Sequence, residues 1–141
     1  MNYTVEKSII IRATPAEVWD AIINPEKVKQ YLFGTDMSAD WRVGGKITYK
    51  GSWDGKEYED GGTILELDPE KLLKSTYWSS MSGTENIPEN QMIVTYRVDE
   101  TTTGTSLTIM QENSKTQEAS EHSGENWNMV LSAMKKLIER K

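Results

Sequence analysis

Few side chains in this sequence are of the types that perform acid–base or nucleophilic chemistry, and their spacing follows no catalytic pattern. His122 is the only histidine, and it lies in a polar stretch. A general base needs an orienting partner and a substrate within hydrogen-bond reach, and no motif around His122 supplies either. Ser79 and Ser80 lack the G-x-S-x-G setting of a nucleophilic serine. The sequence therefore predicts no catalytic residue.

Three neighbouring carboxylates are the most concentrated candidate for a metal site. Glu57 and Glu59 would project from one face of a strand, with Asp60 next to them. Hard cations prefer oxygen ligands, but the Asx-rich spacing of a calcium loop is missing. The chain has no cysteine, which excludes thiolate ligands and disulfides. We expect a solvated acidic strand edge here, with no bound metal and no cofactor.

The aromatic and methionine residues carry more information about binding. Five Trp, six Tyr and seven Met stand against a single Phe. Trp and Tyr combine a large apolar face with a polar group, and Met adapts its shape, so these types suit a cavity that orients a ligand. On alternating strand positions, the residues predicted to face a final helix are Tyr49, Trp78, Val94, Tyr96, Leu107 and Ile109. The matching helical residues are Trp19, Tyr31, Trp127, Leu131 and Met134.

The same eleven residues also fit an ordinary core. Most apolar stripes in proteins fill the interior and bind nothing. Core filling and ligand binding therefore both remain open at this point. The hairpin tip is interpreted more simply, as a tight turn on the surface rather than a pocket mouth or partner-binding edge. It comprises Trp53, Asp54, Gly55, Glu57 and Tyr58.

Length and charge limit the remaining classes of function. A chain of 141 residues fits one domain, spanning residues 1–141. The net charge of −6 repels phosphate backbones and anionic lipid, which argues against nucleic-acid and membrane binding. Residues 1–25 lack the pattern of a signal peptide, and no apolar stretch is long enough to span a bilayer. A cytoplasmic location is the expectation.

Periodicity predicts the elements that would hold the aromatic residues in place. Residues 3–12 alternate as a strand, and Thr14, Pro15 and Glu17 then form the start of a helix with a capping box. A second short helix is predicted from Asn24 to Gly34. The period then changes to two, with strands predicted at 37–42, 46–51, 57–67, 72–79, 91–98 and 105–111. Gly61 and Gly62, inside one of these strands, indicate a bulge or a sharp bend.

The C-terminal segment returns to helical spacing. Residues 112–124 are polar and are expected to begin as a loop, and one long helix is predicted over about residues 117–140. Its apolar face carries Trp127, Val130, Leu131, Met134, Leu137 and Ile138. The order of elements predicts an α+β helix-grip fold, in which a curved antiparallel sheet wraps around the long C-terminal helix.

Several motifs resemble those of the START-like (SRPBCC) superfamily. Residues 9–21, IIIRATPAEVWDA, are similar to its opening strand and helix. Other segments resemble one branch of this superfamily, the branch named after the activator of the heat-shock chaperone ATPase. These segments are residues 43–46 (VGGK), 54–55, 61–62, 68–72 (DPEKL) and 124–131 (GENWNMVL). The resemblance runs along nearly the whole chain and implies the helix-grip fold. It says less about function, because this fold is used by lipid carriers, hormone receptors, cyclases and chaperone helpers.

Three functions from different classes follow from the residues and the resemblance together. The first is a binding domain for a small apolar or amphipathic ligand. The second is a co-chaperone or protein-interaction domain, which the name of the branch implies and which would have a chaperone as its partner. The third is a cyclase- or hydrolase-like enzyme that uses pocket residues such as Tyr49, Tyr96 or Glu112. No catalytic spacing supports the third, so a non-enzymatic protein is expected.

Overall fold

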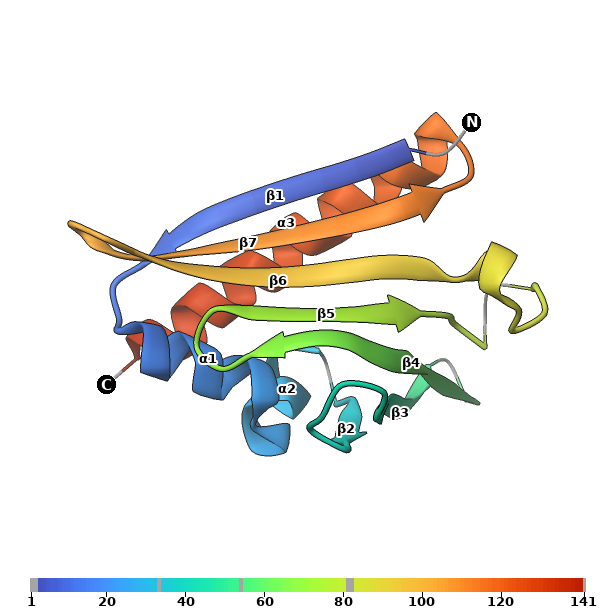
Figure 1. Cartoon of the computed structure of the whole chain (residues 1–141), viewed down its shortest axis with the longest axis horizontal. Coiled ribbons are helices and arrows are strands. Elements are labelled where there is room, and N and C mark those ends of the chain that lie inside the picture. Colours follow the sequence, from blue (N-terminus) through green and yellow to red (C-terminus); the bar gives the residue numbers. More distant parts are fainter. Residues whose placement is uncertain (1–2, 33, 54, 81–82, 141) are drawn as a thin grey trace.

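A seven-stranded antiparallel sheet dominates the computed structural model, which describes residues 3–32, 34–53, 55–80 and 83–140 (Figure 1). The strands lie in the order β1-β7-β6-β5-β4-β3-β2. Their bounds are β1 Tyr3–Ile11, β2 Asp36–Ala39, β3 Lys46–Trp53, β4 Lys56–Asp68, β5 Leu72–Tyr77, β6 Met92–Thr101 and β7 Gly104–Ser114. The helices are α1 Pro15–Ile23, α2 Pro25–Tyr31, the short 3-10 helix η1 Pro88–Asn90 and the long α3 Gln117–Glu139. The predicted α+β helix-grip fold is confirmed.

The chain turns from β1 into α1 through a capping box. The Thr14 hydroxyl accepts a hydrogen bond from the Glu17 backbone N–H at 3.2 Å, and the Glu17 carboxylate accepts one from the Thr14 N–H at 3.2 Å. Pro15 takes the first helical position, where its missing N–H costs nothing. These bonds satisfy backbone donors that the first turn of a helix leaves without partners.

Replacing Thr14 with alanine is expected to lower the free energy of unfolding by about 1 kcal/mol, the usual effect of losing such a cap. Urea unfolding followed by circular dichroism measures this. Thr102→Ala, in the exposed turn between β6 and β7, is the matched control and should change stability by less than half as much. Equal effects of the two substitutions would show that the cap contributes nothing.

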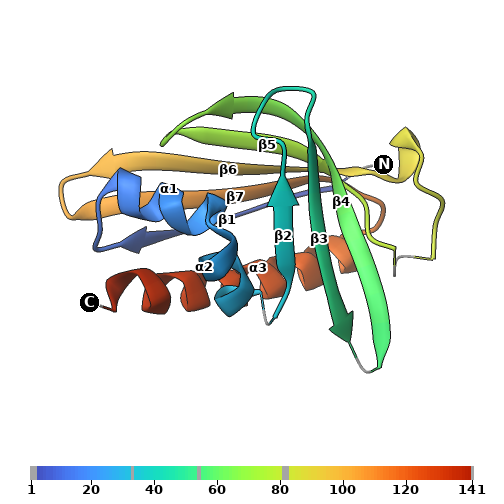
Figure 2. The same ribbon diagram turned by 90° about the horizontal axis from the view of Figure 1, so that it is seen from below.

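The sheet bends sharply along β4. Figure 2 shows β3 and the first part of β4 turned down toward α3, while β5, β6 and β7 run above the helix. Gly61 has a φ of 154°, and a Cβ on it would collide with the Ile47 carbonyl of β3. A Cβ on Gly62 would collide with the Thr76 carbonyl of β5. Only glycine allows both neighbouring strands to approach so closely, so the predicted bend at these two residues is present.

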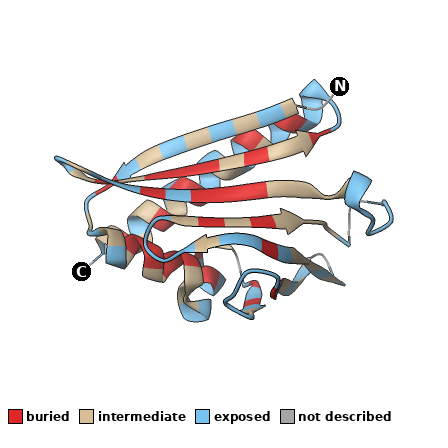
Figure 3. Cartoon of the chain, viewed as in Figure 1, coloured by how far each residue is buried: buried red, intermediate tan, exposed pale blue. Residues whose placement is uncertain are grey.

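Helix α3 crosses the concave face of the sheet and packs mainly along β1, with α1 and α2 beside its C-terminal half (Figures 1 and 2). Figure 3 shows buried residues concentrated on β5, β6, β7 and the inner side of the helices. Val130, Leu131, Met134 and Ile138 supply the buried face of α3. At Gly124 the helix lies so close to β1 that an added Cβ would be 3.0 Å from Val5.

The segment after residue 111 differs from the expected loop. β7 continues to Ser114, paired with Tyr3 of β1, and α3 begins at Gln117. The Thr116 hydroxyl accepts a hydrogen bond from the Ala119 N–H at 3.0 Å and so caps the helix. The first turns of α3 are polar because most of their residues are exposed, and so they lack the apolar stripe that marks the later turns. Asp54, at the predicted hairpin turn, lies outside the described residues.

Candidate functional site

A cavity of about 410 Å³ lies between the concave face of the sheet, the end of α2 and the N-terminal half of α3. Five aromatic side chains line it: Tyr49, Tyr58, Tyr77, Tyr96 and Trp127. Its aliphatic and thioether residues are Leu32, Met92, Val94 and Val130. Its other polar residues are Thr35, Asp60, Ser75, Gln111, Ser123 and Asn126.

Strand pairing brings these residues to one face of the sheet. Side chains directly opposite one another in an antiparallel pair share a face, and so do residues two apart along one strand. The opposed pairs in the cavity wall are Tyr49 and Asp60, Tyr77 and Met92, Ser75 and Val94, and Val94 and Gln111. A hydrogen bond between Tyr77 and Asp60 joins β5 to β4, so the cavity wall is continuous from β3 to β7.

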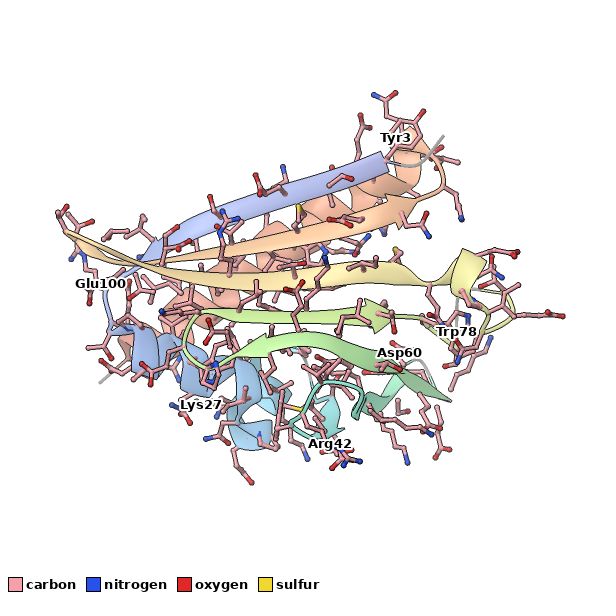
Figure 4. All side chains as sticks on the ribbon, viewed as in Figure 1. Tyr3, Lys27, Arg42, Asp60, Trp78 and Glu100 are labelled. Carbon is pink, nitrogen blue, oxygen red and sulfur yellow. The ribbon has the colours of Figure 1, made fainter. Side chains whose placement is uncertain are left out.

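Asp60 anchors a polar cluster at the β3–β4 end of the cavity (Figure 4). Its Oδ2 accepts a hydrogen bond from the Tyr77 hydroxyl at 2.9 Å. Its Oδ1 accepts bonds from the Ser79 hydroxyl at 2.9 Å and from the Ser80 backbone N–H at 3.1 Å. The Tyr58 hydroxyl is 2.6 Å from that of Thr35, which in turn donates to the Leu32 carbonyl. These bonds offset the cost of placing a carboxylate in a partly apolar wall.

Gln111 anchors a second polar cluster, between β7 and α3. Its amide nitrogen donates to the Ser123 hydroxyl at 2.9 Å and to the Ser114 hydroxyl at 3.3 Å. Its amide oxygen accepts a hydrogen bond from the Trp127 indole N–H at 3.0 Å. The Trp127 ring also meets Tyr96 edge to face, with ring centroids 6.2 Å apart. Gln111 thus fixes the Trp127 side chain in the wall of the cavity.

Four tyrosines in and around the cavity are held in the protonated form. Burial raises the pKa of the Tyr31, Tyr49, Tyr77 and Tyr96 phenols, and at Tyr77 the nearby Asp60 carboxylate adds to the effect. Within the described part of the chain, the Tyr49 and Tyr96 hydroxyls have no hydrogen-bond partner. They are therefore available to donate to a molecule in the cavity.

The raised pKa values predict that the protein loses stability in alkali. The unfolded chain releases these protons near a pH of about 10 while the folded chain keeps them, so the stabilisation is complete below that pH and is lost as the pH rises further. Each tyrosine that stays protonated only in the folded state contributes a loss of about 1.4 kcal/mol per pH unit. The part of the tyrosinate absorbance that comes from these four residues should rise for the native protein only as it unfolds, at a higher pH than for the protein in urea. Superimposable titration curves would contradict the expectation.

The structure divides the eleven residues predicted for a ligand pocket into two groups. Tyr49, Val94, Tyr96 and Trp127 line the cavity. The others lie elsewhere in the fold, six of them buried in the core: Trp19, Tyr31, Leu107, Ile109, Leu131 and Met134. Trp78 follows the end of β5, and its indole N–H donates a hydrogen bond to the Thr84 hydroxyl at 3.2 Å (Figure 4). It does not line the cavity, because the preceding residue, Tyr77, takes the inward position.

Sequence reasoning missed most of the polar wall. Asp60 and Tyr58 were assigned to an acidic strand edge and a surface turn, and Gln111, Ser75 and Ser123 were not considered. Alternation along β4 was the available signal, because Tyr58 and Asp60 share one face while Glu57 and Glu59 take the other and are exposed. Asp60 was hard to predict as an inward-facing residue, because charged side chains are seldom buried. The three groups that donate hydrogen bonds to its carboxylate come from other parts of the fold and cannot be identified from the sequence.

The other candidates for chemistry lie away from the cavity. His122 is exposed on α3, and Glu112 does not line the cavity, because β7 directs Gln111 inward. Among the described residues no group of three or more His, Asp and Glu side chains is placed to hold a metal ion. The described cavity wall holds neither histidine nor lysine.

A family model described as Activator of Hsp90 ATPase homolog 1-like protein matches residues 12–139. The chain belongs to this family. The resemblance to the branch of the START-like superfamily named after the chaperone activator is thereby confirmed. No curated protein matches the sequence. In the described part of this chain, no helix has the length and apolar character needed to cross a membrane.

Solved structures share the fold of this activator-like chain over nearly its full length. ChR145 from Cytophaga hutchinsonii is 36% identical, with a TM-score of 0.85, and the match covers 97% of this chain and 94% of that one. MLL2253 from Mesorhizobium loti is 22% identical, with a TM-score of 0.79 and coverage of 99% and 98%. CalU16 from Micromonospora echinospora is 20% identical, with a TM-score of 0.70 and coverage of 97% and 73%. The last two likenesses concern the fold alone.

Proposed function

We propose that this protein binds a small apolar or amphipathic molecule in the cavity beneath the N-terminal half of α3. The observation that carries the proposal is the cavity itself, whose volume of about 410 Å³ lies within the range of roughly 300–1,000 Å³ usual for ligand pockets. Its wall combines large aromatic faces with a few convergent polar groups, which is the composition expected of such pockets.

Two features favour binding over a filled core. Tyr49 and Tyr96 line the cavity, and their hydroxyls have no hydrogen-bond partner in the described part of the chain. A buried phenol usually has a hydrogen-bond partner, and a ligand with an acceptor group would provide one. The ring of aromatic residues would supply most of the contact area. The ligand would then be apolar in its body and polar at one or more points.

Titration with a panel of fatty acids, sterols and flat aromatic compounds tests the proposal. Trp127 lines the cavity, so binding should change tryptophan fluorescence, and any ligand that binds only the folded state raises the melting temperature. We expect at least one class to give saturable changes in both signals. Native mass spectrometry of protein purified from its own host would then identify the class that it retains. If no compound changes either signal and no molecule is retained, the ligand-binding proposal is wrong.

A protein-interaction role is the second candidate, and it rests on the family name together with an exposed apolar loop. Trp41 and Val43, between β2 and β3, are 37% and 65% exposed. The loop is hydrogen-bonded to β4 at Ile64, next to Leu65, which is 38% exposed. A chaperone of the kind that the family name indicates would be the partner. Capture of that chaperone by the wild type, but not by a Trp41→Ser/Val43→Ser variant, would support this role.

The proposal includes two points that the sequence predicted. We propose a cytoplasmic location, which cell fractionation would test. We also propose that the bound molecule leaves unchanged, so that analysis of a ligand after long incubation should recover it intact. A converted product would favour the cyclase- or hydrolase-like alternative instead.

A further inference from the structure

The charges of the cavity wall are one-sided. Asp60 is the only acidic residue in the described wall, and none of the wall residues described is basic. Lys50 on β3 pairs with Glu59 at 3.7 Å, and both are exposed. The ammonium group of Lys7 lies against Gly124 of α3, and it comes from β1, at the opposite edge of the sheet from β3 and β4. An anionic ligand would therefore meet a carboxylate with no compensating cation in the wall.

Asp60 keeps capacity for one further donor. A carboxylate has about four acceptor positions on its two oxygens. Oδ1 uses two of them for Ser79 and Ser80, and Oδ2 uses one for the Tyr77 hydroxyl. Oδ2 can thus accept one more hydrogen bond from a molecule in the cavity.

Three tyrosines of the cavity wall are neighbours of this carboxylate. Tyr49 is the cross-strand neighbour of Asp60, and Tyr58 lies two residues along the same strand on the same face. Tyr77 binds Asp60 directly, and its ring centroid is 6.4 Å from that of Tyr49. Aromatic faces attract cations through their quadrupole within about 6 Å of the ring centroid, and they do so most strongly where water is excluded.

We propose that the cavity selects its ligand by charge: it takes an apolar molecule that ends in an ammonium group, with the cation held by Asp60 and the neighbouring tyrosines, and it rejects the matching carboxylate. This inference rests on the proposed ligand-binding function and adds the class of ligand. A primary or tertiary ammonium would donate its N–H to Oδ2. A quaternary ammonium has no donor and would be held by charge and by the aromatic faces alone.

Three probes with one naphthalene body test the selection: naphthalen-1-ylmethylamine, naphthalen-1-ylmethanol and naphthalene-1-carboxylate, titrated by calorimetry at neutral pH. We expect the amine to bind about tenfold or more tightly than the alcohol, and the carboxylate to bind most weakly. In Asp60→Asn the preference for the amine over the alcohol should fall to about threefold or less, whatever the change in the affinity for the alcohol itself. Asp99→Asn, on exposed Asp99 of β6, changes the net charge equally and should leave all three affinities unchanged.

The design separates failure of the selection from failure of the cavity. Binding of the alcohol with no preference for the amine, or an amine preference that Asp60→Asn leaves intact, overturns the charge selection and leaves the ligand-binding function standing. If none of the three probes binds, both proposals fail for this class of molecule. Should Asp60→Asn not fold, Tyr49→Leu serves instead, and it is expected to weaken the amine more than the alcohol. An equal effect on both probes would overturn the proposal.

Discussion

Replacing Ser75 with leucine is expected to abolish ligand binding while leaving the protein as stable as the wild type or more so. Ser75 lies on β5, opposite Val94, and its small side chain faces the cavity. A leucine there would project into the space that the ligand needs, and affinity for any probe that binds the wild type should fall by about a hundredfold or more. The added methyl and methylene groups would bury apolar surface in space that is otherwise empty, which stabilises the fold by roughly 1–2 kcal/mol.

Two controls make this result specific. Ser75→Ala leaves the cavity open and should bind within about threefold of the wild type, a difference of less than 1 kcal/mol. Ser8→Leu introduces the same side chain on an exposed position of β1 and should alter neither binding nor stability. Calorimetric titration and urea unfolding of all three variants measure both quantities. Undiminished binding by Ser75→Leu would mean that the ligand binds elsewhere, and a large loss of stability would mean that the space is already filled.

The order and type of the seven strands and of α1, α2 and α3 followed from periodicity, because these elements bury one face. The short helix η1 buries no residue and lies in a segment that was expected to be a polar loop. Two local signals were also reliable. Thr14 and Glu17 predicted a capping box and the paired glycines in β4 predicted a bend, and the structure has both. The long helix predicted over about residues 117–140 matches α3, Gln117–Glu139, although the sequence marks its start only weakly. Its first turns are mostly exposed, so no apolar stripe marks them, and the cap at Thr116 is the signal that remained.

To predict a cavity residue, the sequence must indicate both which face of its element is buried and where along that element the cavity lies. Leu107, Ile109, Leu131 and Met134 are buried on the predicted faces, yet they lie in the core beyond the cavity. Periodicity identifies the buried face of an element but not the place along it where a neighbouring element stops packing. Here α1 and α2 lie beside the C-terminal half of α3, and the cavity opens beside its N-terminal half.

Tyr77 and Trp78 show how much depends on one step of register. Adjacent residues in a strand face opposite sides, so a shift of one exchanges the inward residue with the outward one. Size and apolar character favoured Trp78 as the inward residue. The pairing of Tyr77 with Met92 on β6, together with the bond from Tyr77 to Asp60, gives the inward position to the tyrosine. Both determinants are tertiary, and neither can be read from residues 72–79 alone.

Truncating Trp127 to alanine is the second change with a large expected effect, and its contacts explain why. The ring packs edge to face on Tyr96, and its indole N–H donates to the amide oxygen of Gln111, a residue that is only 4% exposed. The substitution removes aromatic contact area and leaves a buried acceptor without its donor. Because Trp127 is only partly buried, we expect a loss of roughly 2–4 kcal/mol in the free energy of unfolding, below that of a fully buried aromatic side chain, and a loss of about tenfold or more in ligand affinity.

Trp127→Phe separates the contribution of the ring from that of the hydrogen bond. Phenylalanine keeps most of the apolar contact but cannot donate to Gln111, so the expected cost is about 1–2 kcal/mol, with ligand affinity mostly retained. Adding Gln111→Met removes the unsatisfied acceptor, and the double variant should therefore lose less stability than the sum of the two single changes by about 1 kcal/mol. Urea unfolding of the four proteins completes the cycle. Strict additivity would show that the Gln111–Trp127 bond does not hold the cavity wall, and unchanged binding by a folded Trp127→Ala would show that the ligand does not contact this wall.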